Sequence, residues 1–242
     1  MTTEAELSSH LIAAHRAAAS EVDPSLYADL DIASAFRIQA AVMAGLGESV
    51  GMLKTAVSPD GVGVAAPIFA AHVGEAGTLQ LPAATVVGIE VEVAAVLKSD
   101  IAADATDGEI LAAIDHYVAG IEICGTRFTD RSKASYAGGL ADSMSAFGYG
   151  YTTEPRAARD AIEGVEIVVR FKGEELYRAP AKHGFGAVNT SLLAYARNQQ
   201  AHMPLKAGMI VTTGSLCGLV PSSGPGRVEV ALGDQTIALD LI

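Results

Sequence analysis

The pattern of hydrophobic and polar residues changes its period along this chain. Residues 3–20 and 32–46 are rich in alanine and repeat apolar residues at spacings of three and four, which predicts two amphipathic helices. Asp31 stands where it would cap the second helix. Further along, apolar residues gather in short runs that favour strands. We therefore expect an N-terminal helical region at residues 1–50 and one compact, strand-rich unit at residues 51–242.

The first half of the strand-rich unit alternates predicted strands with turns and one short helix. Strands are expected at 50–57 (VGMLKTAV), 85–98, 116–125 (HYVAGIEICG) and 145–152, with a Pro/Gly loop at 58–67 (SPDGVGVAAP) after the first. Thr106 and Glu109 resemble a capping box that opens a helix over 107–115. Residues 129–143 are small and polar, which indicates a loop or a short helix.

The C-terminal third is dominated by strand patterns. Residues 165–179 (VEIVVRFKGEELYRA) predict a hairpin that turns at Lys172 and Gly173. A helix is expected over 188–201, and residues 205–242 supply three more strands that are broken by glycine turns. Because helices gather early and strands late, we predict an α+β fold with a largely antiparallel or mixed sheet.

Composition and charge narrow the classes of function. Half of the 242 residues are hydrophobic and only 18% are charged, which favours extensive buried surface, including subunit interfaces. A formal net charge of −12 argues against a nucleic-acid partner, because phosphate neutralisation needs clustered Lys and Arg. Neither a membrane span nor the apolar core of a signal peptide is found. With two cysteines and no CxxC motif, we expect a cytoplasmic protein without membrane partners.

Acidic residues stand inside two strands that are otherwise apolar. Glu90 and Glu92 lie in VGIEVEVAAVL and point to the same face of their strand, roughly 7 Å apart. Glu122 lies in the strand AGIEIC. One explanation is a sheet with a solvated face, and another is pairing with Lys98 or Arg127. The third is a site in which three carboxylates hold Mg²⁺ or Mn²⁺, which removes their mutual repulsion.

Several motifs together resemble a known family. They are AFRIQ at 35–39, GIEVEVAAVL at 88–97, IEICGTRF at 121–128, LADSMSAFGYG at 140–150 and LKAGMIVTTGSLCG at 205–218. Their order and gaps are similar to those of the 2-keto-4-pentenoate hydratase and 4-oxalocrotonate decarboxylase group, which belongs to the fumarylacetoacetate hydrolase superfamily. The resemblance covers about residues 30–242.

The resemblance implies a mixed β-roll core, formed by residues 51–242, with Mg²⁺ or Mn²⁺ on Glu90, Glu92 and Glu122. It also implies a small 2-oxo or 2-hydroxydienoic acid as substrate and a homo-oligomeric assembly. Lys54 matches the family lysine that assists proton transfer. The turn formed by Thr213, Gly214 and Ser215 matches the one that binds the substrate carboxylate. An acid of the family is missing here, because Ile68 stands in its place.

Other candidate residues have two readings each. Asp142 could contact substrate or a metal-bound water, or could cap a loop. Arg127 and Arg131 follow the third glutamate and could meet an acidic substrate, although surface arginines are common. His15 and Glu21 form a conceivable lid pair of the kind that C–C hydrolases of the superfamily use, but their surroundings do not match.

Function follows from the proposed site. The first hypothesis is a metal-dependent hydratase (a lyase) that adds water to a 2-hydroxy-2,4-dienoate and gives a 4-hydroxy-2-oxo acid, in the breakdown of aromatic compounds. The alternatives are a 2-oxo acid decarboxylase of the 4-oxalocrotonate type, a C–C hydrolase, and a non-catalytic partner subunit, which the replacement of the family acid by Ile68 motivates.

Overall fold

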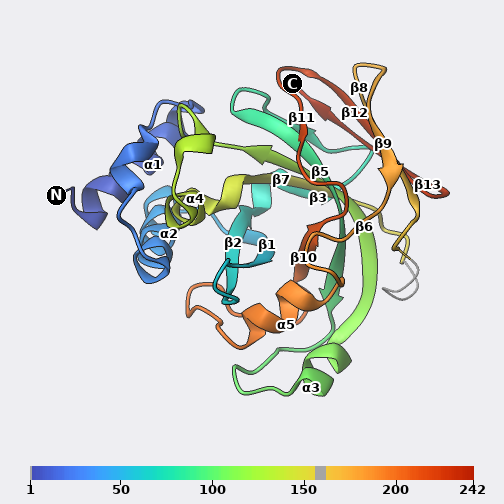
Figure 1. Cartoon of the computed structure of the whole chain (residues 1–242), viewed down its shortest axis with the longest axis horizontal. Coiled ribbons are helices and arrows are strands. Elements are labelled where there is room, and N and C mark those ends of the chain that lie inside the picture. Colours follow the sequence, from blue (N-terminus) through green and yellow to red (C-terminus); the bar gives the residue numbers. More distant parts are fainter. Residues whose placement is uncertain (1, 156–161) are drawn as a thin grey trace.

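Two sheets and an N-terminal group of helices make up the chain, as a computed structural model that describes residues 2–155 and 162–242 shows. The helices α1 (Glu4–Ala17) and α2 (Ile32–Leu46) lie at one end of the molecule, and a five-stranded sheet lies at the other (Figure 1). Between them curls a mixed eight-stranded sheet. The predicted α+β class with a mixed, curled sheet is confirmed.

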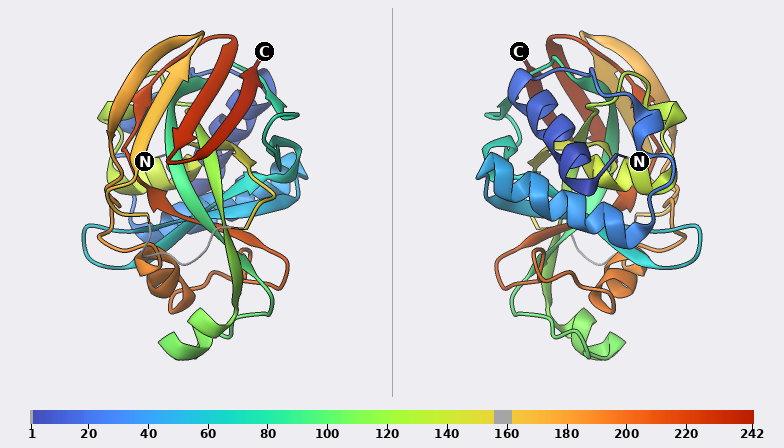
Figure 2. Two further views of the ribbon diagram at one scale, coloured as in Figure 1. Left: turned by 90° about the vertical axis from the view of Figure 1, so that its right-hand side faces the viewer. Right: turned by 90° about the vertical axis from the view of Figure 1, so that its left-hand side faces the viewer.

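Both predicted N-terminal helices are present, and they lie side by side (Figure 2, right). Thr3 and Glu6 form a capping box at the start of α1. The Asp31 carboxylate accepts a hydrogen bond of 2.7 Å from the backbone N–H of Ser34, as the sequence predicted. The second helix ends at Gly47, whose φ of 69° suits a residue without a side chain.

The eight-stranded sheet has the order β2-β1-β10-β5-β6-β7-β3, with β11 paired to β5. The pairs β1–β10 and β3–β7 are parallel, and the other pairs are antiparallel. Its strands are β1 (Val50–Val57), β2 (Gly63–Phe69), β3 (Val73–Glu75), β5 (Val86–Leu97), β6 (Ile114–Gly125), β7 (Ala146–Tyr151), β10 (Ile210–Ser215) and β11 (Val220–Pro221).

The five-stranded sheet has the order β4-β13-β12-β8-β9. Its strands are β4 (Gln80–Leu81), β8 (Glu166–Phe171), β9 (Glu174–Pro180), β12 (Gly226–Leu232) and β13 (Gln235–Leu241). The predicted hairpin is confirmed, because Phe171 pairs with Glu174 and the two turn residues Lys172 and Gly173 have φ angles of 55° and 80°. Positive φ at both positions is the mark of a turn that matches the twist of the strands.

One predicted loop is in part a strand. Residues 63–67 of the expected Pro/Gly loop belong to β2, which pairs antiparallel with β1. Pro67 is tolerated because β2 is an edge strand, where a missing N–H breaks no ladder. Gly63 is required by packing, since a Cβ there would lie 2.1 Å from the carbonyl carbon of Ala194. Both residues therefore reflect tertiary position rather than a turn.

The remaining helical segments are short. The helix α3 ends at Ala112 because β6 begins two residues later, and α5 covers only the first part of the predicted 188–201 helix. Their bounds are α3 (Asp107–Ala112), α4 (Tyr136–Ala141), α5 (Thr190–Ala196), η1 (Pro24–Tyr27), η2 (Ala70–His72), η3 (Arg131–Lys133) and η4 (Ser143–Ser145). In the described part of the chain, no helix has the length and apolarity that crossing a membrane requires.

Three apolar clusters hold these elements together. One packs α1, α2, α4 and α5 against the outer face of the curled sheet, and a second fills the space between the two sheets. A third, small cluster lines the concave face and includes Met52, Ala66, Ile68 and Tyr149. Because the first cluster contains residues from both sides of residue 50, helices and sheet share a core, and the division at that point stays a prediction.

Candidate metal and active site

The three predicted glutamates lie on the concave face of the eight-stranded sheet. Glu90 and Glu92 are on β5, and Glu122 on β6 is paired directly opposite Glu90. The side chains of Glu92 and Glu122 are 0% exposed, and that of Glu90 is 16% exposed. A solvated sheet face therefore does not explain them.

Lys54 reaches this group from β1. Its Nζ donates hydrogen bonds to Glu122 Oε1 at 2.6 Å and to Glu90 Oε2 at 3.1 Å. The alternative of pairing with Lys98 or Arg127 is wrong, because Lys98 is exposed after the end of β5 and Arg127 pairs with Asp142. We call Lys54, Glu90, Glu92 and Glu122 the carboxylate cluster.

The carboxylate cluster places three carboxyl groups around one lysine. Among the described residues, neither oxygen of Glu92 nor Glu122 Oε2 has a hydrogen-bond partner. Buried carboxylate oxygens without partners are costly unless a cation or a proton satisfies them. Glu90 and Glu122 offer oxygens within 4.8 Å of each other, and Glu92 lies on the same face of β5. Carboxylate oxygens are the ligands that Mg²⁺ and Mn²⁺ prefer, so the residues present fit such an ion.

The three carboxyl groups of the cluster have different pKa values because their surroundings differ. Burial and then the neighbouring Glu122 raise the pKa of Glu92 well above its ordinary value. Burial raises the pKa of Glu122 to about 7, against the opposing charge of Lys54. Burial would also raise the pKa of Glu90, but Lys54 outweighs it and the pKa is lowered. For Lys54, burial acts to lower the pKa, yet Glu122 and Glu90 hold it well above its ordinary value.

Two residues of this face were not found from the sequence. Tyr149 on β7 is paired with Glu122, and its ring lies over Gly120, where a Cβ would come within 2.4 Å of the phenol oxygen. Its hydroxyl has no partner in the described part of the chain, and burial followed by Glu92 raises the pKa of Tyr149 well above its ordinary value. Sequence alternation could have placed Tyr149 inward, but not opposite Glu122.

Cys124 is the second such residue. Potential ligand atoms of Glu90, Glu122 and Cys124 lie within 4.8 Å of one another. The Sγ of Cys124 is 3.7 Å from Glu122 Oε1. Its place two residues after Glu122 gave the signal, since both share one strand face. Burial raises the pKa of Cys124 well above its ordinary value, and a neutral thiol is a poor ligand for a hard cation.

The predicted carboxylate-binding turn runs beside the cluster. Ser215 pairs with Glu92 across an irregularity between β10 and β5, and Gly214 has a φ of 115°. Thr213, however, faces the opposite side, where its hydroxyl donates to the carbonyl of Val93 at 2.6 Å. Its neighbour Thr212 faces the cluster instead, and its hydroxyl acts to lower the pKa of Glu92 without forming a well-aligned hydrogen bond.

Asp142 and Arg127 form an ion pair with each other. Both are buried, and Arg127 Nε donates to Asp142 Oδ1 while Nη2 donates to the Asp142 carbonyl at 2.6 Å. The second carboxylate oxygen accepts from the hydroxyl of Thr126 at 2.7 Å. The polar atoms of Asp142 are therefore used to fix the chain after β6, and its catalytic role stays a prediction, as does substrate binding by Arg127.

Arg131 is the arginine whose charge reaches the cluster, where it acts to lower the pKa of Glu90. It lines a cavity of about 310 Å³ together with Val57, Met144 and Phe185. Val57 belongs to β1, the strand that carries Lys54, but none of the four residues of the carboxylate cluster lines this cavity.

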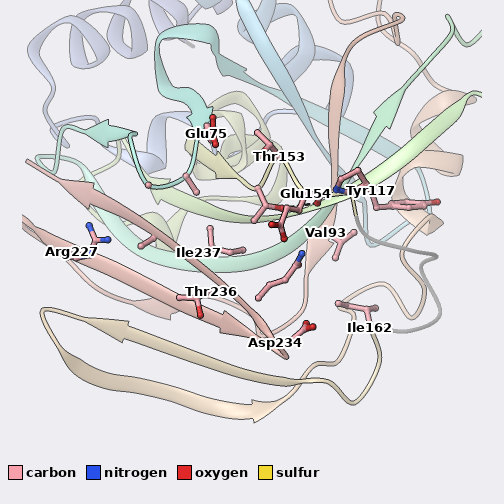
Figure 3. A pocket seen from close by; sticks show the side chains of 16 residues that line it. Glu75, Val93, Tyr117, Thr153, Glu154, Ile162, Arg227, Asp234, Thr236 and Ile237 are labelled. Atoms are coloured by element: carbon pink, nitrogen blue, oxygen red, sulfur yellow. Dashed lines mark hydrogen bonds between the residues drawn. The ribbon is translucent and has the colours of Figure 1, made fainter.

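A second cavity lies on the other side of the sheet. It has a volume of about 860 Å³, lies between the two sheets, and carries Glu75, Glu154 and Asp234 (Figure 3). Val93 lines it, and this residue alternates with Glu92 to the opposite face of β5. None of the predicted site residues is among its lining.

Comparisons with solved structures support the fold. The 4-oxalocrotonate decarboxylase from Pseudomonas putida G7, complexed with magnesium and adipate, is 16% identical, has a TM-score of 0.77, and is matched over 100% of this chain and 99% of that one. The structure of the same enzyme complexed with calcium and acetate has a TM-score of 0.76. The 2-hydroxyhepta-2,4-diene-1,7-dioate isomerase from Mycobacterium marinum is 14% identical, with a TM-score of 0.57 over 81% of this chain and 76% of that one.

The sequence itself gives the family. No curated protein sequence matches this chain significantly. The sequence model of the fumarylacetoacetate (FAA) hydrolase C-terminal family, however, matches residues 55–239, which include Glu90, Glu92, Glu122 and the strands that carry them. The predicted superfamily is thereby confirmed, and the chain belongs to the fumarylacetoacetate hydrolase C-terminal family.

Proposed function

We propose that this protein is a divalent-metal-dependent lyase that hydrates a 2-hydroxy-2,4-dienoate to a 4-hydroxy-2-oxo acid. One observation carries the proposal: the ammonium group of Lys54 lies between Glu122 and Glu90, beside the unpartnered carboxylate of Glu92. A group that exchanges a proton with carbon, next to hard oxygen ligands for a Lewis acid, is what interconversion of a 2-oxo acid and its enol needs.

The cation of this proposal is Mg²⁺ or Mn²⁺, and Glu90, Glu92 and Glu122 would hold it. Support comes from the buried oxygens of Glu92 and Glu122 that have no hydrogen-bond partner among the described residues, and from the magnesium and calcium in the similar decarboxylase. When bound, such an ion supplies a Lewis acid for the carboxylate and C2 oxygen of a 2-oxo acid. Cys124 is close enough to contribute, but its thiol suits softer ions.

Lys54 would move the proton between carbon and oxygen. Its raised pKa means that it holds a proton at neutral pH, so it acts first as a donor to the carbon chain of the dienol. Lys54 then takes up the proton of the 2-hydroxyl, which leaves a 2-oxo-3-enoate. Water adds across its double bond, with the OH bonding to C4 and the remaining proton going to C3, and this gives the 4-hydroxy-2-oxo acid. The apolar floor beneath, formed by Met52, Ala66 and Ile68, would exclude bulk water from the reacting carbons.

A second candidate is decarboxylation of a related 2-oxo acid, and Ile68 favours it. Hydration needs a group that orients a water at the far carbon, whereas loss of CO₂ uses the same enolate without added water. Ile68 is 1% exposed and belongs to the apolar cluster on the concave face, at the position of the missing family acid. An apolar side chain there cannot orient water.

Product analysis separates the candidates. The parent protein with saturating Mg²⁺ is incubated with 2-hydroxypenta-2,4-dienoate and, separately, with 4-oxalocrotonate, and products are followed by carbon NMR. Formation of 4-hydroxy-2-oxopentanoate supports hydration, while CO₂ release from the second compound supports decarboxylation. Glu92→Gln should abolish either activity, and Glu174→Gln, at an exposed glutamate of β9, should change neither. Turnover of neither compound by the parent contradicts both candidates.

For partners, we propose the small-molecule acid and further copies of this chain, with no role for nucleic acid or a membrane. The support is the sparse charge, at 18% of residues, with a net charge of −12.

A further inference from the structure

A small cavity lies between α1 and the end of the eight-stranded sheet, apart from the carboxylate cluster. Its volume is about 220 Å³. Its polar lining residues are His15 on α1, His72 on η2, Thr85 just before β5 and Arg127 just after β6. The rest of the lining is mostly apolar, and includes Ala14, Pro82 and Phe147.

Arg127 offers this cavity an unused donor. Its side chain is 1% exposed, and Nε and Nη2 are bound to Asp142. The third nitrogen, Nη1, has no hydrogen-bond partner among the residues that the structure describes. A buried N–H without an acceptor costs free energy, so an acceptor atom placed in the cavity would be favoured. Asp142 already balances the charge of Arg127, however, so an anion entering alone would leave one negative charge uncompensated.

His72 can provide the missing positive charge. Its Nδ1 lies 3.1 Å from the carbonyl oxygen of Phe147, which can only accept, so Nδ1 carries a hydrogen. In the neutral ring, Nε2 is then an acceptor, and it becomes a donor only when the ring takes up a proton. Burial lowers the pKa of His72, against Phe147 and Glu48, so the ring is neutral in the unliganded cavity at neutral pH.

The other groups around the cavity favour the same state. Burial, followed by the charges of Arg127 and His72, lowers the pKa of His15 to about 2. The charged groups that face the two imidazoles are therefore Arg127, with its partner Asp142, and Glu48 near His72. The cavity holds two uncharged rings and one guanidinium nitrogen that lacks an acceptor among residues 2–155 and 162–242.

We propose that this cavity binds a short-chain carboxylate together with one proton. The carboxylate accepts from Arg127 Nη1 and from the protonated ring of His72, and the alkyl chain packs on Ala14, Pro82 and Phe147. The volume is below the roughly 300 to 1,000 Å³ of sites for drug-sized ligands, which suits an acid of a few carbons.

The proposed carboxylate site does not depend on the proposed reaction, but an ion pair connects it to another cavity. Arg127 lines the small cavity, while its partner Asp142 lines the cavity of about 310 Å³ that also contains Arg131. The buried Arg127–Asp142 pair thus separates the two spaces.

Propionate tests the inference, in EDTA so that no divalent cation is bound. The imidazole C–H signals of the parent, His72→Gln and His10→Gln are followed by NMR during titration, with chloride at equal ionic strength as the reference. Glutamine at 72 can still donate to Phe147 but cannot take up a proton, and His10 is an exposed residue of α1.

We expect a saturable shift of the His72 signal in the parent and in His10→Gln. The signal of His15, which lines the same cavity, should report at least about tenfold weaker binding to His72→Gln than to the parent. Affinity should fall as pH rises, approaching about tenfold per pH unit where one proton is taken up on binding. The inference is overturned if propionate moves the His72 signal no more than chloride does. It is equally overturned if the parent and a folded His72→Gln bind propionate alike, or if binding does not depend on pH.

Discussion

Replacing Lys54 by methionine tests the electrostatics of the carboxylate cluster directly. The substitution keeps a long, unbranched side chain and removes the ammonium group that lies 2.6 Å from Glu122 and 3.1 Å from Glu90. Removing one partner of a buried ion pair costs about 3–5 kcal/mol, because the remaining charge is left uncompensated. Lys54 is only 12% exposed, so solvent screens little of this loss.

The stability lost in Lys54→Met should increase as pH rises. The pKa of Glu122 is about 7 with Lys54 present, and it must rise further once the positive charge is gone. A carboxyl group whose pKa is raised on folding destabilises the protein above its unfolded pKa, and a proton relieves this at lower pH. The difference between parent and variant should therefore be largest at about pH 8 and shrink below about pH 6.

Thermal unfolding in EDTA measures the effect. For a chain of this length, about 2–4 °C in Tm corresponds to 1 kcal/mol, so Lys54→Met should unfold about 6–20 °C lower at high pH. Saturating Mg²⁺ should narrow the gap, because a bound cation compensates the same carboxylates. Lys98→Met is the matched control, an exposed lysine after β5, and should stay within about 0.5 kcal/mol of the parent. Equal Tm values for the two variants in EDTA would refute the reasoning.

Three further predictions concern ion binding, packing and assembly. Mg²⁺ affinity, measured by calorimetry, should rise with pH up to about 7, since protons on Glu92 and Glu122 compete with the ion; a flat profile would contradict this. Gly63→Ala should lose about 1–3 kcal/mol or more in denaturant unfolding, because its Cβ would lie 2.1 Å from the Ala194 backbone, whereas Gly108→Ala, with open space around it, should not. Light scattering should give a dimer or a larger closed assembly, and a mass of 24.8 kDa would count against it.

The local features of this structure could be predicted from the sequence. The caps at Thr106 and Asp31 and the turn at Lys172 and Gly173 are local chemistry, and all three formed as predicted. Alternation along β5 also placed Glu90 and Glu92 on one face, which needs no knowledge of neighbouring strands.

The remaining features depend on contacts between distant segments. The direct pairing of Glu90 with Glu122 comes from the register of β5 and β6, and Lys54 reaches both only because β1 and β5 flank β10. Residues 63–67 form a strand because β1 pairs with them, which their glycine and proline did not suggest. The buried ion pair between Arg127 and Asp142 likewise depends on the fold of the chain after β6.

In the function proposed above, Lys54 moves a proton at substrate carbon beside a cation held by the three glutamates. Exchange of the C3 protons of 2-oxopentanoate with D₂O, followed by proton NMR at saturating Mg²⁺, reports this step without requiring the full reaction. The account predicts exchange by the parent and by Lys98→Met that depends on Mg²⁺, and a fall of about 10²- to 10⁴-fold in Lys54→Met. Equal exchange rates in the parent and a folded Lys54→Met would contradict it.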